Sequence, residues 1–233
     1  MRAWIRSSAI NDNTIDLGRT DEEVLTSEVS DEARLLLREF SHRINNEFAS
    51  AIGVISIAAA RSADDEAKVA LAAVQDRLQN YALVHHALQM PEDVSCIDAA
   101  AYLRQLCWAI SRSKLERNGI ELRFVERTFW MNSERCWRLG LIVSELITNA
   151  ERHAFRKGGG LIRVELLPSV SFIVCRVTDN GTGEANTYPG HGLKIVKALA
   201  KSLGGTIDQR FGPHGATAVL IFPADMDTSE RLA

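Results

Sequence analysis

Four short stretches of the sequence hold residues that could bind a nucleotide or accept a phosphoryl group. The first is EFSHRINNEF, residues 39–48, in which Glu39 stands three residues before His42 and Asn46 four residues after it. An imidazole is ordinarily largely neutral at physiological pH, so one ring nitrogen keeps a lone pair that can attack phosphorus. On a helix, all three side chains would lie within about one turn of one another.

The second stretch is LIVSELITNAERHAF, residues 141–155, where Glu145 and Asn149 stand four apart and Arg152 follows. On a helix these three side chains line the side away from the apolar residues. A carboxylate and an amide oxygen are hard ligands that suit Mg²⁺ bound to a nucleotide, and an arginine adds positive charge for phosphates. Taken alone, the stretch also fits an ordinary polar helix face.

The third stretch is VTDNGTG, residues 177–183, in which an apolar run ends on Asp179. A carboxylate at the end of a strand can accept a hydrogen bond from the exocyclic amine of a base. Gly181 and Gly183 have no side chain, which allows a planar ring to approach the backbone. An ordinary turn after a strand would have the same composition.

The fourth stretch is GHGLKIVKALA, residues 190–200, which places Gly190, Gly192 and Leu193 at the start of a predicted helix. The free N–H groups and the positive dipole end of such a helix suit an anion. Two glycines before a helix are weak evidence by themselves.

Two predicted helices would position His42. Apolar residues at intervals of three and four predict an amphipathic helix from Asp31 to about Arg61, and a second helix that Pro91 ends. The apolar side of the first lies nearly opposite His42, which should therefore face water, and a solvated helix face is the simpler interpretation of that stretch. The pair forms an antiparallel hairpin with too little partner surface, so we expect a homodimer through a four-helix bundle.

The second half of the chain mixes helices and strands. Its patterns predict helices at 98–117, 133–155 and 193–203 and strands in NGIELRFVE, LIRVELL, FIVCRVTD, TIDQRF and ATAVLIF. This order favours an α/β sandwich with helices on one face of a largely antiparallel sheet, and an α+β class for the whole chain. The predicted division is a loose arm at 1–30, the helical hairpin at 31–92, the sandwich at 97–225 and a tail at 226–233.

Composition excludes several classes of protein. The 233 residues are 46% hydrophobic and 24% charged, as in ordinary globular proteins, and the net charge of -3 gives no reason to expect nucleic acid as a partner. The four cysteines show no spacing typical of a metal site or a disulfide framework. No apolar run reaches the roughly 18 residues of a membrane span, so we expect no span and a cytoplasmic location.

In order and spacing, the four stretches together resemble the motifs of sensor histidine kinases. EFSHRINNEF resembles the phosphoacceptor H-box of the branch with arginine after the histidine, related to HWE kinases, and VHHALQ in the second helix also resembles that branch. SELITNAERHAF resembles the N-box, DNGTG and GHGL the two glycine boxes, and HGATAVLIFP the closing glycine motif. The resemblance implies the GHKL-type (Bergerat) ATP-binding fold shared with Hsp90-type, MutL-type and gyrase-type ATPases.

By this resemblance, the chain would be a cytosolic protein-histidine kinase of two-component signalling. ATP would bind with its adenine on Asp179, with Mg²⁺ on Asn149 and Glu145, and with its phosphates over the helix that begins at Gly192. The γ-phosphoryl group would pass to His42 and then to an aspartate in the receiver domain of a response regulator. Input would come from a separate sensor protein, from the N-terminal arm, or from a domain outside this sequence.

The residues around His42 depart from the family pattern in two ways. Arg43 follows the histidine where many histidine kinases have an acidic residue, so we expect Glu39 to orient the ring. Asn45 stands where the branch commonly has lysine. Asn46 matches a position where an amide can orient water for dephosphorylation of the regulator.

Two alternative functions stay open. One is a phosphatase-only or non-catalytic signalling adaptor that keeps the kinase fold. The other is a GHKL-type ATPase or serine kinase in which the hairpin is only a dimer scaffold. We interpret the histidines outside the first stretch as packing or surface residues.

Overall fold

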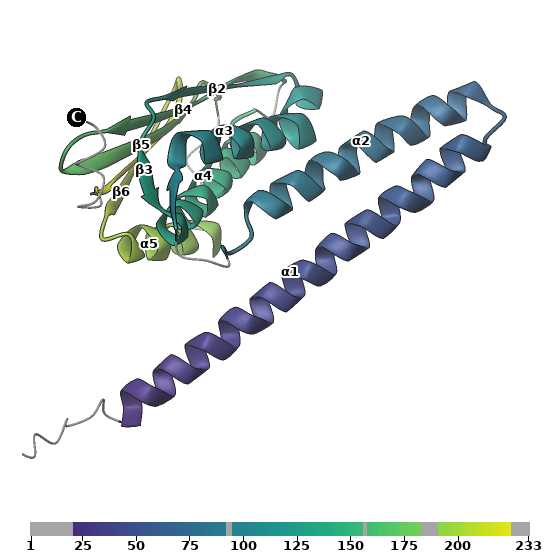
Figure 1. Ribbon diagram of the computed structural model, residues 1–233. Helices are drawn as coiled ribbons and strands as arrows, with labels where there is room; N and C mark the ends of the chain where they lie inside the picture. Colours follow the sequence, from purple (N-terminus) through teal and green to yellow (C-terminus); the bar gives the residue numbers. More distant parts are fainter. Residues whose placement is uncertain (1–20, 92–94, 156–157, 183–190, 225–233) are drawn as a thin grey trace, which may run out of the picture. The chain divides into compact units, whose positions relative to one another are not determined.

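The computed structural model describes residues 21–91, 95–155, 158–182 and 191–224, and Figure 1 shows their elements along the chain. Helix α1 spans Asp21–Arg61 and so begins ten residues before the predicted start. Its first ten residues, DEEVLTSEVS, contain neither glycine nor proline, the residues that most disfavour a helix interior. The predicted loose arm is therefore helical from Asp21 onward.

From Ser41 onward the chain forms one compact unit, in which α1 and α2 (Asp65–Ala87) make a helical hairpin. Two contacts of His85 on α2 join the helices. Its Nδ1 lies 2.9 Å from Oδ1 of Asn45 on α1, and its ring centroid lies 6.0 Å from that of Phe48. These contacts place Asn45 and Phe48 of α1 beside the end of α2, so the predicted antiparallel pairing of the two helices is confirmed.

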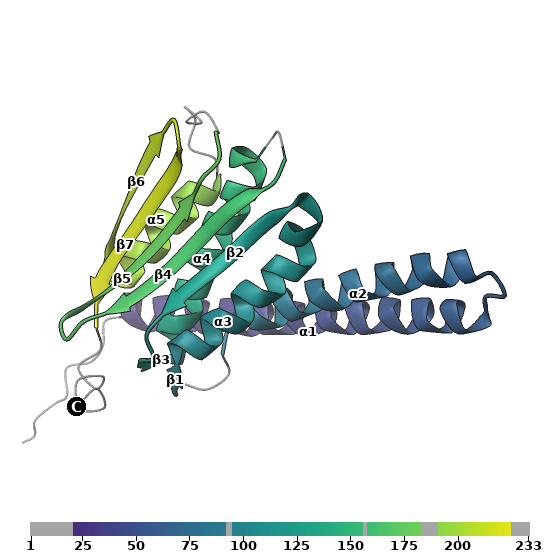
Figure 2. The same ribbon diagram turned by 90° about the horizontal axis from the view of Figure 1, so that it is seen from above.

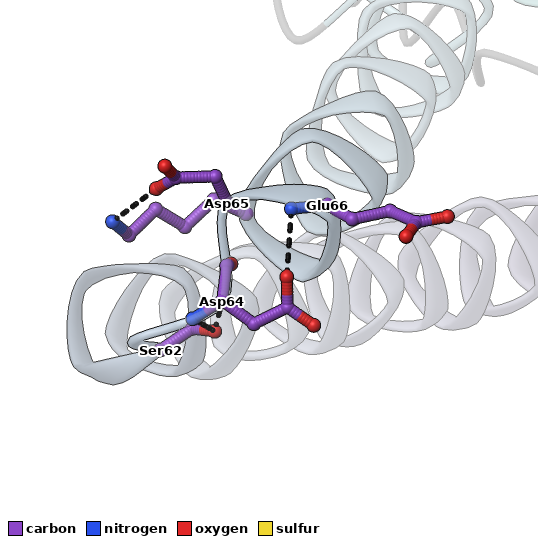
Figure 3. A network of polar contacts seen from close by, with 5 residues as sticks. Ser62, Asp64, Asp65 and Glu66 are labelled. Atoms are coloured by element: carbon purple, nitrogen blue, oxygen red, sulfur yellow. Dashed lines mark hydrogen bonds and ion pairs between the residues drawn. The ribbon is translucent and has the colours of Figure 1, made fainter.

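Polar side chains close the turn between the two helices (Figure 3). Asp64 is the N-cap of α2, and its carboxylate accepts a hydrogen bond from the Glu66 N–H at 2.9 Å. The Ser62 hydroxyl accepts from the Asp64 N–H and donates to the Asp64 carbonyl, both at 3.2 Å. Lys68 pairs with Asp65 at 2.9 Å. Because these bonds satisfy groups that a helix end leaves unpaired, the turn is set locally by its own residues.

The second half of the chain builds a five-stranded sheet with three α-helices on one face (Figure 2). Its elements are β1 (Cys96–Asp98), α3 (Ala99–Ile110), η1 (Ser111–Leu115), η2 (Glu116–Asn118), β2 (Ile120–Glu126), β3 (Trp130–Asn132), α4 (Ser133–Ala154), β4 (Gly160–Pro168), β5 (Phe172–Asp179), α5 (His191–Ser202), β6 (Thr206–Gly212) and β7 (Gly215–Pro223). The strand order is β2-β4-β5-β7-β6, with β2 and β4 parallel and the other neighbours antiparallel. The predicted α/β sandwich is confirmed.

The core lies between this sheet and the helices. On β4, the alternate residues Ile162, Val164 and Leu166 are completely buried, while Arg163 between them is exposed. The apolar side of α4 forms the opposite wall with Leu139, Ile142, Val143 and Ile147, all at 0% exposure. The alternate apolar residues of β4 and the apolar side of α4 thus face the same core. Both elements follow a regular period, which is why the sequence pattern predicted them well.

Two residues of the second half of the chain donate hydrogen bonds to carbonyl groups at the end of α2. Pro91 has no N–H to offer the Ala87 carbonyl, and the Tyr102 hydroxyl donates to that carbonyl instead, at 2.7 Å. The Trp137 indole N–H donates to the Leu88 carbonyl at 2.8 Å. Burial raises the pKa of Tyr102 well above its usual value, so its hydroxyl remains a donor.

Two local features differ from the sequence prediction. The helix predicted at 98–117 ends at Ile110 and continues through a π-helical turn and a 3₁₀ turn to Gly119, whose φ of 65° is left-handed. Strands β1 and β3, three residues each, form a separate small sheet that we did not predict, because three residues are too few to show a period. No helix within the described ranges is long and apolar enough to cross a membrane.

Candidate active site

Asp179 is the last residue of β5, and backbone N–H groups from two segments hold its carboxylate. Its Oδ1 accepts hydrogen bonds from Gly181 at 3.0 Å and from Ala216 at 3.3 Å. The turn after β5 and the start of β7 therefore fix the same oxygen. Among the residues that the structure describes, none bonds to Oδ2. The second oxygen is thus available to an external donor such as an amine.

Two glycines allow the backbone to pack closely around this aspartate. A Cβ on Gly181 would lie 2.3 Å from the Ala154 carbonyl oxygen at the end of α4. A Cβ on Gly215, whose φ is +122°, would lie 1.9 Å from the carbonyl oxygen of Asp179 itself. Both clashes are with backbone atoms, which cannot rotate away as a side chain can. Any side chain at either position would therefore shift Asp179 or the loop after it.

Glu145 and Gly192 bring the second and fourth predicted stretches together. A Cβ on Gly192, in the first turn of α5, would lie 1.8 Å from Oε1 of Glu145 on α4. The start of α5 therefore lies directly against the Glu145 carboxylate, and any side chain at position 192 would displace that carboxylate. Leu193 follows, half-buried. The first turn of α5 and the carboxylate of Glu145 therefore lie at one place.

Asn149 follows Glu145 by one turn of α4 and is half-buried, and Arg152 is exposed. Within the described ranges, no group of three or more His, Cys, Asp or Glu residues could hold a metal alone. Two oxygen donors one turn apart nevertheless fit Mg²⁺, which ordinarily takes most of its ligands from phosphates and water. Gly183 and Gly190 lie outside the described residues.

The phosphoacceptor candidate lies on α1 with the orientation expected from its periodicity. His42, Glu39 and Asn46 are exposed, whereas Ile44 and Phe48 are half-buried toward the other side of the helix. The prediction that His42 faces water is confirmed. The polar side of this helix is thus accessible to a phosphoryl donor and to a second protein.

The four cysteines take no part in this arrangement. Cys107, Cys136 and Cys175 are buried, and burial raises the pKa of each thiol, that of Cys175 to about 12. Cys96 is exposed in the small sheet.

Sequence reasoning missed two contributors, Gly215 and the backbone N–H of Ala216. Both lie in HGATAVLIFP, which we had identified only as a closing motif. The glycine directly before an apolar strand was the available signal. Its partner could not be inferred, because the bond to Asp179 joins positions 37 residues apart in the sequence.

Comparison with known proteins agrees with this arrangement. Residues 39–114 match the family described as "Histidine kinase", and residues 137–226 match "Histidine kinase-, DNA gyrase B-, and HSP90-like ATPase". The chain is 24% identical over 214 residues to "Sensor histidine kinase PdtaS" of Mycolicibacterium smegmatis, covering 88% of this chain and 42% of that protein. It is 24% identical over 220 residues to "Blue-light-activated histidine kinase 2" of Erythrobacter litoralis, covering 90% of this chain and 62% of that one.

A solved structure has the same fold. The histidine kinase domain of the Erythrobacter litoralis EL346 blue-light activated histidine kinase superposes with a TM-score of 0.55 at 22% identity, covering 88% of this chain and 97% of that one. The chain spans about two fifths of the length of PdtaS. The two matched families cover most of residues 39–226, in the order in which the helical hairpin and the sandwich follow one another. The chain therefore contains a region of the histidine kinase family followed by a GHKL-type ATPase domain, and the relatives named above are sensor histidine kinases.

Proposed function

We propose that this protein is an ATP-dependent histidine kinase that phosphorylates its own His42 and passes the phosphoryl group to an aspartate of a response regulator receiver domain. The observation that carries the proposal is the fixed carboxylate of Asp179, with one oxygen held by two backbone N–H groups and the other available to the amine of adenine. Because ATP is the phosphoryl donor, the proposed location is the cytoplasm.

Each residue of the site has a defined part in this reaction. Asp179 Oδ2 would accept from the adenine amine, and the free N–H groups at the start of α5 would hold phosphate oxygens. Mg²⁺, held by Asn149 and Glu145, would neutralise phosphate charge when bound. A ring nitrogen of His42 would attack the γ-phosphorus, the bond from phosphorus to the bridging oxygen would break, and ADP would leave. Arg152 would add charge near the phosphates.

Two exposed residues near His42 have proposed roles of their own. Glu39 would orient the His42 ring and accept its proton, because Arg43 cannot do so. Asn46, one turn beyond His42, would orient a water molecule when the protein dephosphorylates its regulator. Their exposure on α1 is consistent with contact to a nucleotide or a receiver domain.

A homodimer through the hairpin is part of the proposal. Large apolar side chains on both helices remain exposed, namely Val54, Ile57, Val69, Val74 and Leu83. A second hairpin packed against them would bury these side chains in a four-helix bundle. Sedimentation at micromolar concentration is the direct measurement, and a monomer there would exclude the bundle.

The test of the proposed function is incorporation of label from γ-labelled ATP with Mg²⁺. We expect label that is lost in acid and retained in base, as phosphohistidine requires. His42→Ala and Asn149→Ala should abolish it, whereas His86→Ala, which changes an exposed histidine on α2 whose ring bonds to Gln89, should leave it unchanged. Acid-stable label would favour a serine kinase, and absence of label with retained regulator binding would favour a non-catalytic adaptor.

A further inference from the structure

His85 reaches across the hairpin to the turn of α1 that follows the phosphoacceptor. Its Nδ1 lies 2.9 Å from Oδ1 of Asn45, and its ring is tilted by 55° against that of Phe48 at 6.0 Å. His86, the next residue, is exposed and bonds instead to Gln89 on its own helix. The two adjacent histidines therefore have different surroundings, and among the described residues the ring of His85 bonds to α1 whereas that of His86 bonds within its own helix region.

The chemistry of the Asn45 amide gives this contact a direction. Oδ1 can only accept, so Nδ1 of His85 must carry the proton and donate. The other end of the same amide is the NH₂ group, and no residue within the described ranges accepts a hydrogen bond from it. Once His85 holds Oδ1, the amide cannot exchange its two ends without losing that bond. The donor end of Asn45 is thereby kept available.

Asn45 follows His42 by three residues on α1, so the two side chains are neighbours on the helix surface, with Cβ atoms about 5–6 Å apart. A phosphoryl group joined to His42 carries three oxygens that accept hydrogen bonds and would lie within reach of that amide. A lysine at this position would also donate to phosphate, but as a positive point charge. An amide carries no charge, and its direction matters far more than that of an ammonium group.

We propose that His85 is a positioning residue for phosphoryl transfer: it holds the Asn45 amide by its oxygen, so that the amide NH₂ donates to the phosphoryl group arriving on His42. The proposal rests on the proposed kinase function and adds a second helix to the phosphoacceptor site. His85 touches neither nucleotide nor phosphorus, and acts only through Asn45. Phe48 lies beside the imidazole, with the two ring centroids 6.0 Å apart.

The kinetic test is a double-mutant cycle on the single-turnover rate of His42 phosphorylation at saturating ATP. His85→Phe keeps an aromatic ring beside Phe48 but removes the N–H donor. We expect this variant and Asn45→Ala each to slow the reaction about 10- to 100-fold, the loss of one hydrogen bond to a charged group, with KM for ATP unchanged. The double variant should be no slower than Asn45→Ala alone, and His86→Phe should match the wild type.

Additive losses in the double variant, an unchanged rate in His85→Phe, or an effect on KM alone would each overturn the proposal. Circular dichroism and sedimentation should show equal helix content and equal assembly for all variants.

A second measurement does not depend on activity. Nitrogen-15 NMR of the His85 ring should show the proton on Nδ1 in the wild type and a mixture of tautomers in Asn45→Ala, and a proton on Nε2 in the wild type would refute the link. Wild-type protein that takes no label, yet shows the Nδ1 proton, refutes the kinase function and with it the role of His85 in transfer, while the cross-helix bond stands.

Discussion

Replacing Asp179 with asparagine tests the nucleotide site most sharply, because the structure separates the two oxygens of this carboxylate by role. Oδ1 already accepts from Gly181 and Ala216, and an asparagine oxygen can accept from the same two N–H groups. The new NH₂ group must then occupy the position of Oδ2. In Asp179→Asn a donor would face the adenine amine, which is also a donor, while the surrounding backbone keeps its bonds.

The expected loss can be worked out from one hydrogen bond. A bond to a charged acceptor contributes about 1.5–3 kcal/mol, so ATP should bind about 10- to 150-fold more weakly to Asp179→Asn. Inosine triphosphate has a carbonyl where ATP has its amine, and that carbonyl accepts from the asparagine NH₂. Calorimetric titration with both nucleotides should therefore show a preference for ATP in the wild type that is lost or inverted in the variant.

A matched control is Asp208→Asn, which makes the same change on β6 at an exposed aspartate bonded to Arg210. It should leave both nucleotide affinities unchanged. Asp179→Asn that binds ATP within a factor of two of the wild type, with the ATP preference intact, would refute the assignment of Oδ2 to adenine. Equal thermal unfolding of the two variants would show that the loss is local.

Three further predictions follow from the packing. Gly192→Ala should leave the unfolding temperature nearly unchanged, since the flexible Glu145 can swing away from the new methyl group, but should weaken Mg²⁺-dependent ATP binding in a titration. Gly53→Ala, a change on α1 with open space around it, should leave ATP binding unchanged. Iodoacetamide at mildly alkaline pH should modify Cys96 in the folded protein and spare the other three thiols, whose pKa values burial raises; mass spectrometry showing two or more rapid adducts would disagree. Burial and the charge of its neighbouring histidine lower the pKa of His85 below 6.5, so the unfolded state binds more protons as pH falls. The stability that His85 adds is present above that value and is lost on acidification through the folded-state pKa, so the unfolding midpoints of wild type and His85→Phe should converge between about pH 8 and pH 5, and a constant difference would contradict this.

Much of the sandwich could be predicted from the sequence because each element obeys one period. Strand β5 was predicted with its observed bounds, since the alternation of Ile173, Cys175 and Val177 runs unbroken to Asp179. Helix α4 was predicted to within one residue for the same reason. The spacing of each polar residue from the apolar residues then predicted the side of the strand or helix on which it lies.

What the sequence could not show are bonds between distant segments. The link between Asp179 and Ala216 depends on β5 and β7 being neighbours in the sheet, which no local pattern records. The contact of His85 with Asn45 likewise depends on the register of two helices over 40 residues. Both positions look ordinary in sequence, and each becomes informative only when its partner is known.

The two hydrogen bonds donated to carbonyl groups at the end of α2 have an energetic consequence. Tyr102 and Trp137 hold the Ala87 and Leu88 carbonyls from two different helices, α3 and α4. Lifting α2 away breaks both bonds together, at about 0.5–1.5 kcal/mol each. Their sum is comparable to the coupling energy of about 1–3 kcal/mol that one bound ligand typically exerts on a distant site. The junction is therefore strong enough to bias how the hairpin and the ATPase domain move, and weak enough for a single binding event to release it.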